Sequence, residues 1–169
     1  MPEAEEEFDR TSRLLAGAQR AVAKVRFCWL ATGGEPGRPS LRPMGRLPPE
    51  PGDDAWTLRF VTDGRSAKAV DIRRVSQVAL IFQHDANDAF VTVAGVAALR
   101  EGPSEVSRRW KPAYAQFFPT ETDRANAAFL EVEARRMELW VRGVTPEPFG
   151  LQATILERNA AGVWRLQSK

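Results

Sequence analysis

The sequence predicts a mainly β domain: a closed or half-open antiparallel barrel of about six strands with two or three short helices around it. Short runs of alternating apolar residues are separated by turns rich in Gly, Pro and Asp. Helical patterns do not alternate with these runs, as the crossover helices of a parallel sheet would. A chain of 169 residues can bury a sizeable core without disulfides or structural metal ions, so residues 1–169 are expected to form one domain.

The first expected element is a helix over residues 1–24, with acidic residues in its first turns, where they complement the helix dipole. One face of this helix carries apolar residues at spacings of three and four: Leu15, Ala18, Val22 and Val25. The next segment, 27–32, is apolar on both faces and is therefore expected to be a central strand. Cys28 is expected to be an inert core thiol, and Trp29 is also assigned to the core.

A second strand is expected over 40–47, where Pro43 indicates a sheet edge or a bulge because proline cannot donate to a ladder. The following strand alternates at period two through Trp56, Leu58 and Phe60 and ends in the turn Asp63-Gly64. Ser66 is a suitable N-cap for the helix that comes next.

This strand, turn and helix predict an anion site. The first backbone N–H groups of a helix have no partner within the helix, and the helix dipole favours negative charge there. Ser66 adds a hydroxyl, and Arg65 and Lys68 add positive charge, which together suit a phosphate. An ordinary strand-to-helix connection with solvated basic residues is the alternative.

Two more strands, 75–83 and 90–99, are expected to form a hairpin, and Gly95 in the second indicates a bulge or a close backbone approach. A long strand follows over 129–141. Its inward set is expected to be Leu130, Val132, Ala134, Met137, Leu139 and Val141. Because the step from Ala134 to Met137 is three residues, a bulge is predicted at Arg135-Arg136.

Residues 103–126 are expected to form a helical excursion that begins at Pro103. This segment holds an aromatic group typical of a lid or of a dimer contact: Tyr114, Phe117 and Phe118. Two short C-terminal strands are expected over 153–157 and 163–166.

Charge and composition favour a small anionic ligand over a polyanion. The formal net charge is only +2, and between positions 38 and 74 eight Lys and Arg residues face five Asp and Glu residues. Without an interleaved aromatic stacking platform, nucleic acid is not an expected partner. One cysteine and one histidine, His84, give neither an internal disulfide nor a zinc cluster. No apolar run reaches the roughly 18 residues of a membrane span, and a cytoplasmic location is expected.

Several motifs, taken in order, resemble the flavin-binding split barrels related to pyridoxamine 5′-phosphate oxidase, and within them the general stress protein branch. The resemblance covers most of the chain. Its motifs are Arg38-Pro39-Ser40-Leu41-Arg42-Pro43-Met44, Phe60-Val61-Thr62-Asp63 with Ser66 and Lys68, Val91-Thr92-Val93-Ala94-Gly95, Trp110-Lys111-Pro112 with Phe117-Phe118-Pro119, and Glu138-Leu139-Trp140.

The resemblance implies a six-stranded split barrel that forms a homodimer, with FMN in the groove between the subunits. The residues implied to hold the FMN phosphate are Arg42, Ser66 and Lys68, in agreement with the anion site expected from the helix start. Those implied to border the ribityl chain and ring are Met44 (or its backbone), Thr62 and Asp63. Gln83 and Trp110 are implied to approach the isoalloxazine, and the resemblance leaves open which subunit supplies each.

The resemblance implies the cofactor and not the substrate. The pyridoxamine phosphate oxidases carry an Arg-x-His pair soon after the position matching Trp140, whereas residues 141–152 contain Arg142 and no histidine. Oxidation of pyridoxamine phosphate is therefore not expected. Three functions stay open: an FMN-dependent oxidoreductase with an unidentified small-molecule substrate, a non-catalytic flavin carrier or stress sensor, and a small barrel without FMN. Replacement of FMN by a deazaflavin or haem also stays open.

Overall fold

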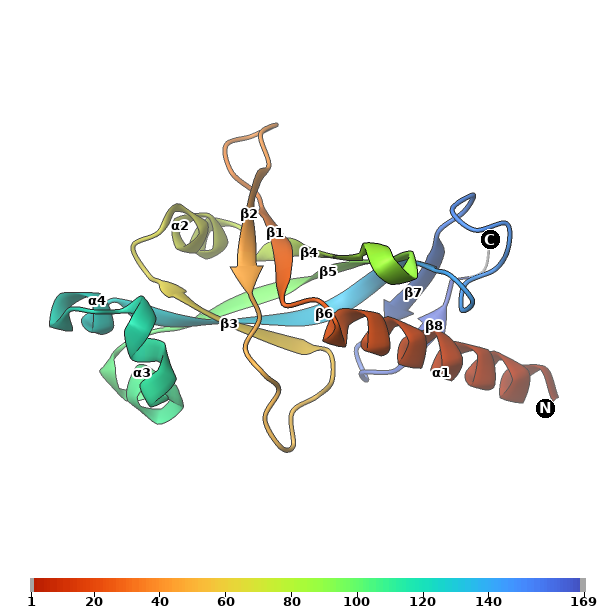
Figure 1. Cartoon of the computed structure of the whole chain (residues 1–169), viewed down its shortest axis with the longest axis horizontal. Coiled ribbons are helices and arrows are strands. Elements are labelled where there is room, and N and C mark those ends of the chain that lie inside the picture. The colour runs from red at the N-terminus through yellow and green to blue at the C-terminus, as the bar shows by residue number, and fades with distance from the viewer. Residues whose placement is uncertain (1, 168–169) are drawn as a thin grey trace.

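The computed structural model describes residues 2–167, which form one curved antiparallel sheet with helices at both of its ends (Figure 1). The strands are β1 (Phe27–Thr32), β2 (Ser40–Gly45), β3 (Thr57–Asp63), β4 (Gln77–His84), β5 (Ala89–Arg100), β6 (Ala127–Val141), β7 (Thr154–Arg158) and β8 (Trp164–Leu166). The helices are α1 (Pro2–Ala23), α2 (Ala67–Arg74), α3 (Pro103–Arg109) and α4 (Glu121–Ala125), with single 3-10 turns η1 (Asp85–Asn87) and η2 (Pro112–Phe117).

The strand order confirms the expected class. The sheet runs β2-β1-β4-β5-β6-β7-β8, and β3 also pairs with β6. The first half of the long strand β6 pairs with β3, and its second half pairs with β7. A backbone hydrogen bond from Leu47 N to Arg59 O (2.8 Å) joins the end of β2 to β3, so the first six strands make a half-open barrel. The sheet has eight strands, not six, because β7 and β8 extend it beyond β6.

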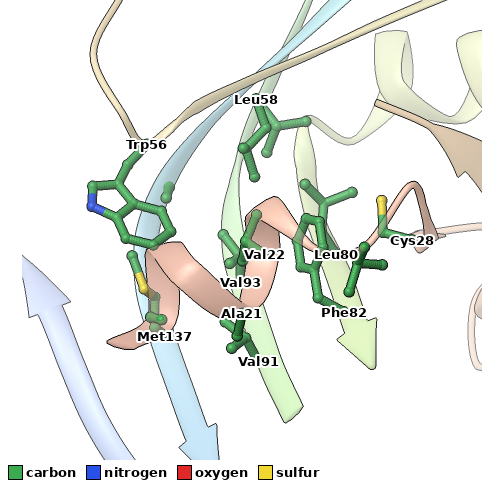
Figure 2. Close-up of a cluster of buried hydrophobic side chains, with 14 of the residues drawn as sticks. Ala21, Val22, Cys28, Trp56, Leu58, Leu80, Phe82, Val91, Val93 and Met137 are labelled. Atoms are coloured by element: carbon green, nitrogen blue, oxygen red, sulfur yellow. The ribbon is translucent and has the colours of Figure 1, made fainter. Parts of the chain in front are cut away.

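Helix α1 covers part of the inner face of the sheet. Figure 2 shows Ala21 and Val22 of α1 among side chains from the strands, including Leu80, Val93 and Met137. The six residues predicted to point inward from β6 are all buried, at 6% exposed or less: Leu130, Val132, Ala134, Met137, Leu139 and Val141. The period-two pattern therefore identified the buried face of β6 correctly.

The predicted bulge and the predicted close approach are the same feature. Between β5 and β6 the register shifts, so that Ala94 pairs with Arg136, Gly95 pairs with Ala134, and Arg135 has no partner. A Cβ atom at Gly95 would collide with the carbonyl oxygen of Glu133 and lie 3.0 Å from the carbonyl carbon. Glycine is therefore required here by space.

Replacing Gly95 with alanine is expected to lower the free energy of unfolding by about 1–3 kcal/mol, since the added methyl must displace backbone. Urea denaturation followed by circular dichroism measures the change. Gly33→Ala is the control, because a Cβ there meets nothing nearer than 3.5 Å. Equal stability of the two variants would show that β6 yields at the bulge.

One face of the sheet carries large apolar side chains that are only about half covered by the described residues. Trp29 is 49% exposed, which makes its assignment to the core wrong, whereas Cys28 is buried as expected. Phe27 and Leu41 are also about half exposed, at 58% and 51%. The reason is that β1 lies between β2 and β4, with alternate side chains on the inner, packed face and on this outer face.

Candidate anion site

Four elements meet at the end of the sheet where α2 lies (Figure 1). The edge strand β2 supplies Arg42, and its neighbour β1 supplies Thr32 at its last position. Thr62 comes from the end of β3, and Lys68 lies in the first turn of α2. The arrangement places two cations from separate elements near two threonine hydroxyls.

The guanidinium of Arg42 is held from the side of β1. Its Nη1 donates to Thr32 Oγ1 at 2.7 Å and to the carbonyl oxygen of Leu30 at 3.4 Å. Thr32 Oγ1 in turn donates to Asp71 Oδ2 at 2.7 Å, and Arg42 Nη2 lies 3.8 Å from the same carboxylate oxygen. Burial lowers the pKa of Arg42, and the negative charge of Asp71 opposes this shift.

The ammonium of Lys68 has a neutral partner. Its Nζ donates to Thr62 Oγ1 at 3.0 Å. Burial lowers the pKa of Lys68 most, and the positive charge of Arg42 lowers it further, while Asp63 acts in the opposite direction. Among residues 2–167 Lys68 forms no ion pair within 4.0 Å. An anion between Lys68 and Arg42 would relieve their repulsion.

Ser66 occupies the predicted N-cap position of α2, with φ −66° and ψ 154°. Its side chain makes no capping hydrogen bond, and its Oγ is buried without a partner in the described chain. A buried hydroxyl without a partner costs about 1–3 kcal/mol, and a ligand oxygen or a water molecule would satisfy it. At the start of a helix and close to Lys68, a phosphate oxygen is a suitable partner.

Ser66→Ala is expected to leave the thermal stability of the ligand-free protein unchanged or slightly raised, because no capping bond is lost. The same change should weaken binding of a phosphate ligand by about 1 kcal/mol. Thermal unfolding with and without FMN measures both effects. A clear loss of stability without ligand would mean that Ser66 Oγ caps α2 in solution.

Asp63 and Arg65 pair with each other, and Met44 is part of the core. Asp63 accepts from the backbone N of Arg65 at 2.7 Å and from its guanidinium, and this hydrogen bonding lowers the pKa of Asp63. Arg65 also bonds to Asp123 at 3.1 Å. Met44 is 7% exposed and lies in the hydrophobic core. The guanidinium of Arg65 therefore binds the carboxylates of Asp63 and Asp123, in place of the predicted role in the anion site.

Gln83 and Trp110 lie away from the Arg42–Lys68 cluster. Gln83 is exposed near the far end of β4, and its Nε2 donates to Asp85 Oδ1 at 2.6 Å. Trp110 packs edge-on against Tyr114 and Phe118, with ring centroids 5.9 and 5.8 Å away. Within one subunit these residues form no part of the anion site.

Thr32 and Asp71 belong to the site but were not predicted. Asp71 lies three residues after Lys68, so a helical projection places it on the same side of α2. Thr32 is a hydroxyl at the end of an otherwise apolar strand. Their contact joins positions 39 residues apart and required knowledge of the strand order.

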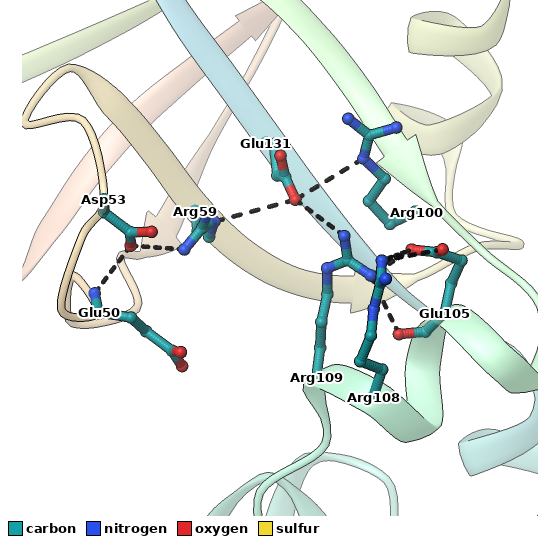
Figure 3. Close-up of polar contacts among 8 residues, drawn as sticks. All are labelled: Glu50, Asp53, Arg59, Arg100, Glu105, Arg108, Arg109 and Glu131. Atoms are coloured by element: carbon teal, nitrogen blue, oxygen red, sulfur yellow. Dashed lines mark hydrogen bonds and ion pairs between the residues drawn. The ribbon is translucent and has the colours of Figure 1, made fainter.

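A second group of arginines is already balanced by acids (Figure 3). Arg59, Arg100 and Arg109 approach Glu131 Oε1 at 3.9, 3.7 and 3.5 Å. Arg59 also pairs with Asp53 at 2.5 Å, and Arg109 pairs with Glu105. This group ties β3, β5, β6 and α3 together. The contrast with Lys68, which has no such carboxylate, favours the α2 end as the place for an anionic ligand.

Within the described residues, no three His, Cys, Asp or Glu side chains come together as a metal site. In the same part of the chain no helix is both long enough and apolar enough to cross a bilayer. Burial raises the pKa of the Cys28 thiol to about 11, which keeps it protonated and unreactive.

A sequence model of proteins described as pyridoxamine 5′-phosphate oxidase like matches residues 16–157, which is most of the chain. The chain belongs to this family. The predicted resemblance is thereby confirmed. No curated protein sequence matches the chain.

Several solved structures share the fold. A pyridoxamine 5′-phosphate oxidase-related, FMN-binding protein from Nostoc punctiforme superposes with a TM-score of 0.70 at 19% identity, over 92% of this chain and 94% of its own. A Clostridium acetobutylicum protein related to general stress protein 26 of B. subtilis gives 0.67 at 16% identity, over 87% and 95%. PhzG from Burkholderia lata, in complex with tetrahydrophenazine-1-carboxylic acid, gives 0.63 at 18% identity, over 92% and 88%.

Proposed function

We propose that this protein binds FMN and that Arg42, Ser66 and Lys68 hold its phosphate. One observation carries the proposal: at the start of α2, a buried serine hydroxyl without a partner and a half-buried lysine without an ion pair lie two residues apart, as far as residues 2–167 show. A phosphate monoester supplies acceptor oxygens for both groups and negative charge for the Arg42–Lys68 pair. Family membership and the FMN-binding protein of the same fold favour FMN among phosphate ligands.

We also propose that the protein works as a homodimer in the cytoplasm. The outer face of β1, β2 and β4 exposes Phe27, Trp29 and Leu41, and a second copy of the chain would remove this apolar surface from water. Ile81 pairs with Trp29, and Gln83 lies on the same side of β4 two residues further on. In such a dimer Gln83 would be near the partner subunit, where it could approach a flavin ring. The single, buried cysteine suits a reducing compartment.

Bound FMN would supply hydride transfer at its N5 atom, and the protein would supply binding, orientation and electrostatics. We therefore propose an FMN-dependent oxidoreductase with an unidentified substrate. Pyridoxamine phosphate is not the proposed substrate. Arg142 pairs with Asp88 at 2.7 Å and packs over Phe149 at 4.3 Å, and no histidine accompanies it.

The same lack of a substrate grip favours a second candidate, a flavin carrier or sensor without efficient turnover. Both candidates predict a yellow protein, so turnover is what separates them. An oxidoreductase should consume a reduced nicotinamide nucleotide catalytically in the presence of an electron acceptor, whereas a carrier should not exceed one equivalent per bound flavin.

The first test is a visible absorption spectrum of the purified protein, followed by identification of the compound that heat releases from it. A flavin spectrum and released FMN are the expected results. Titration of colourless protein with FMN covers the case in which the cofactor is lost on purification. Protein that stays colourless and does not bind added FMN would falsify the assignment.

A further inference from the structure

Arg42 lies on an edge strand. Its guanidinium donates to Thr32, and Thr32 donates to Asp71. We infer that Thr32 and Asp71 are positioning residues, which act on the phosphate of the ligand only through Arg42. The inference rests on the proposed function and adds two residues to it. Neither residue is implied by the family motifs in the sequence.

The hydrogen bonds have a fixed direction. A carboxylate can only accept, so Thr32 must donate its single hydroxyl proton to Asp71, at 2.7 Å. The lone pairs of Thr32 Oγ1 are then available to Arg42 Nη1, also at 2.7 Å. Thr32 is 2% exposed, so water does not compete readily for either bond. This chain fixes one end of the guanidinium and leaves its other donors for a ligand.

The side chain of Arg42 depends on Thr32 for its orientation, because few other contacts restrain it. Its strand β2 has β1 as its one sheet neighbour, and a long arginine side chain loses much rotamer entropy on binding. Holding the side chain in its bound orientation before the ligand arrives reduces this cost. The Leu30 carbonyl contributes a third, longer contact at 3.4 Å.

Asp71 also joins the two halves of the anion site. It lies on α2 one turn after Lys68, and it reaches β1 through Thr32 and β2 through Arg42. Its other oxygen is 3.8 Å from Arg74 Nη2, whose guanidinium also donates to the backbone after β1. The negative charge of Asp71 offsets the repulsion between Arg42 and Lys68 when no ligand is bound.

The test compares variants of Thr32 and Asp71 in the full-length protein by titration with FMN and with riboflavin, which lacks the phosphate. Thr32→Val keeps the shape but removes the hydroxyl, and it should weaken FMN binding about tenfold. Thr32→Ser retains the hydroxyl and should remain within about threefold of wild type. Asp71→Ala should behave like Thr32→Val, and Asp71→Asn, which can still accept from Thr32, should recover most of the affinity. Riboflavin binding should be unchanged in all four.

A double-variant cycle separates positioning from a general structural role. In an Arg42→Ala background, Thr32→Val should have no further effect on FMN affinity, since its effect passes through Arg42. Additive losses, or an equal loss for riboflavin, would overturn the inference while leaving the FMN assignment intact. Unchanged FMN affinity in Thr32→Val would do the same. Wild-type protein that binds no FMN would instead remove the proposed function, and this inference with it.

Discussion

Phe60→Ala is expected to lower the free energy of unfolding by about 3–5 kcal/mol, the largest stability effect that we predict. Phe60 is 0% exposed on β3 and pairs across the sheet with Leu130, which is also 0% exposed. Truncation to alanine removes the buried ring and leaves a cavity that β3, fixed between the end of β2 and β6, cannot close. Urea denaturation followed by tryptophan fluorescence measures the loss.

Phe8→Ala is the matched control for this change, because Phe8 is 70% exposed on α1 and its removal should alter stability by less than about 0.5 kcal/mol. All variants are to be compared at one protein concentration, since unfolding of the proposed homodimer would depend on concentration. A loss below about 1 kcal/mol for Phe60→Ala would contradict the packing of β3 described above.

The strands were predictable because their signal is local. In β6 the inward residues recur every second position, and the single step of three between Ala134 and Met137 shifts the phase, which only an extra residue such as Arg135 can absorb. Gly95 was predictable for a related reason, since a glycine inside a strand usually marks close backbone approach. The strand count was not fixed by such patterns. The short strands β7 and β8 carry too few alternations to show that they join the same sheet.

The predictions that failed concern residues whose surroundings are set by segments distant in the sequence. Trp29 is a large apolar residue of the kind usually found in cores, but it is 49% exposed on the outer face of β1. Arg65 is close to the helix start in sequence, yet Asp63 and Asp123 bind its guanidinium. Thr32 was missed because its role requires a strand and a helix that are distant in sequence to meet.

The anion site was predictable in part, from residues that lie close together along the chain. Ser66 and Lys68 follow from the strand, turn and helix alone, and the structure adds that the Ser66 hydroxyl has no partner there. The approach of Arg42 from β2 was implied by family resemblance, and the positive charge of Arg42 lowers the pKa of Lys68, although less than burial does. These two cations are the groups whose loss should matter most for binding.

Removing both cations, in Arg42→Ala/Lys68→Ala, is expected to weaken FMN binding by about 3–5 kcal/mol, a loss of more than a hundredfold. Each single variant should lose about 1–3 kcal/mol, the range for a charge-assisted hydrogen bond. The ammonium and the guanidinium come from different elements, α2 and β2, so neither can take over the contacts of the other. Fluorescence titration with FMN measures the affinities, and riboflavin binding should change little.

The control removes two exposed positive charges outside the anion site, in Arg100→Ala/Arg108→Ala: Arg100 pairs with Glu131, and Arg108 pairs with Glu105 on α3. Arg100 and Arg108 are 46% and 67% exposed, so both changes should be tolerated by the fold. FMN affinity should stay within about twofold of wild type, because these two side chains pair with Glu131 and Glu105 and not with a residue of the anion site, and exposed charges are screened by salt. If the control loses as much affinity as Arg42→Ala/Lys68→Ala, the protein attracts FMN by its general charge. If neither double variant changes FMN affinity, the phosphate is bound at another place, and the α2 site loses its proposed ligand.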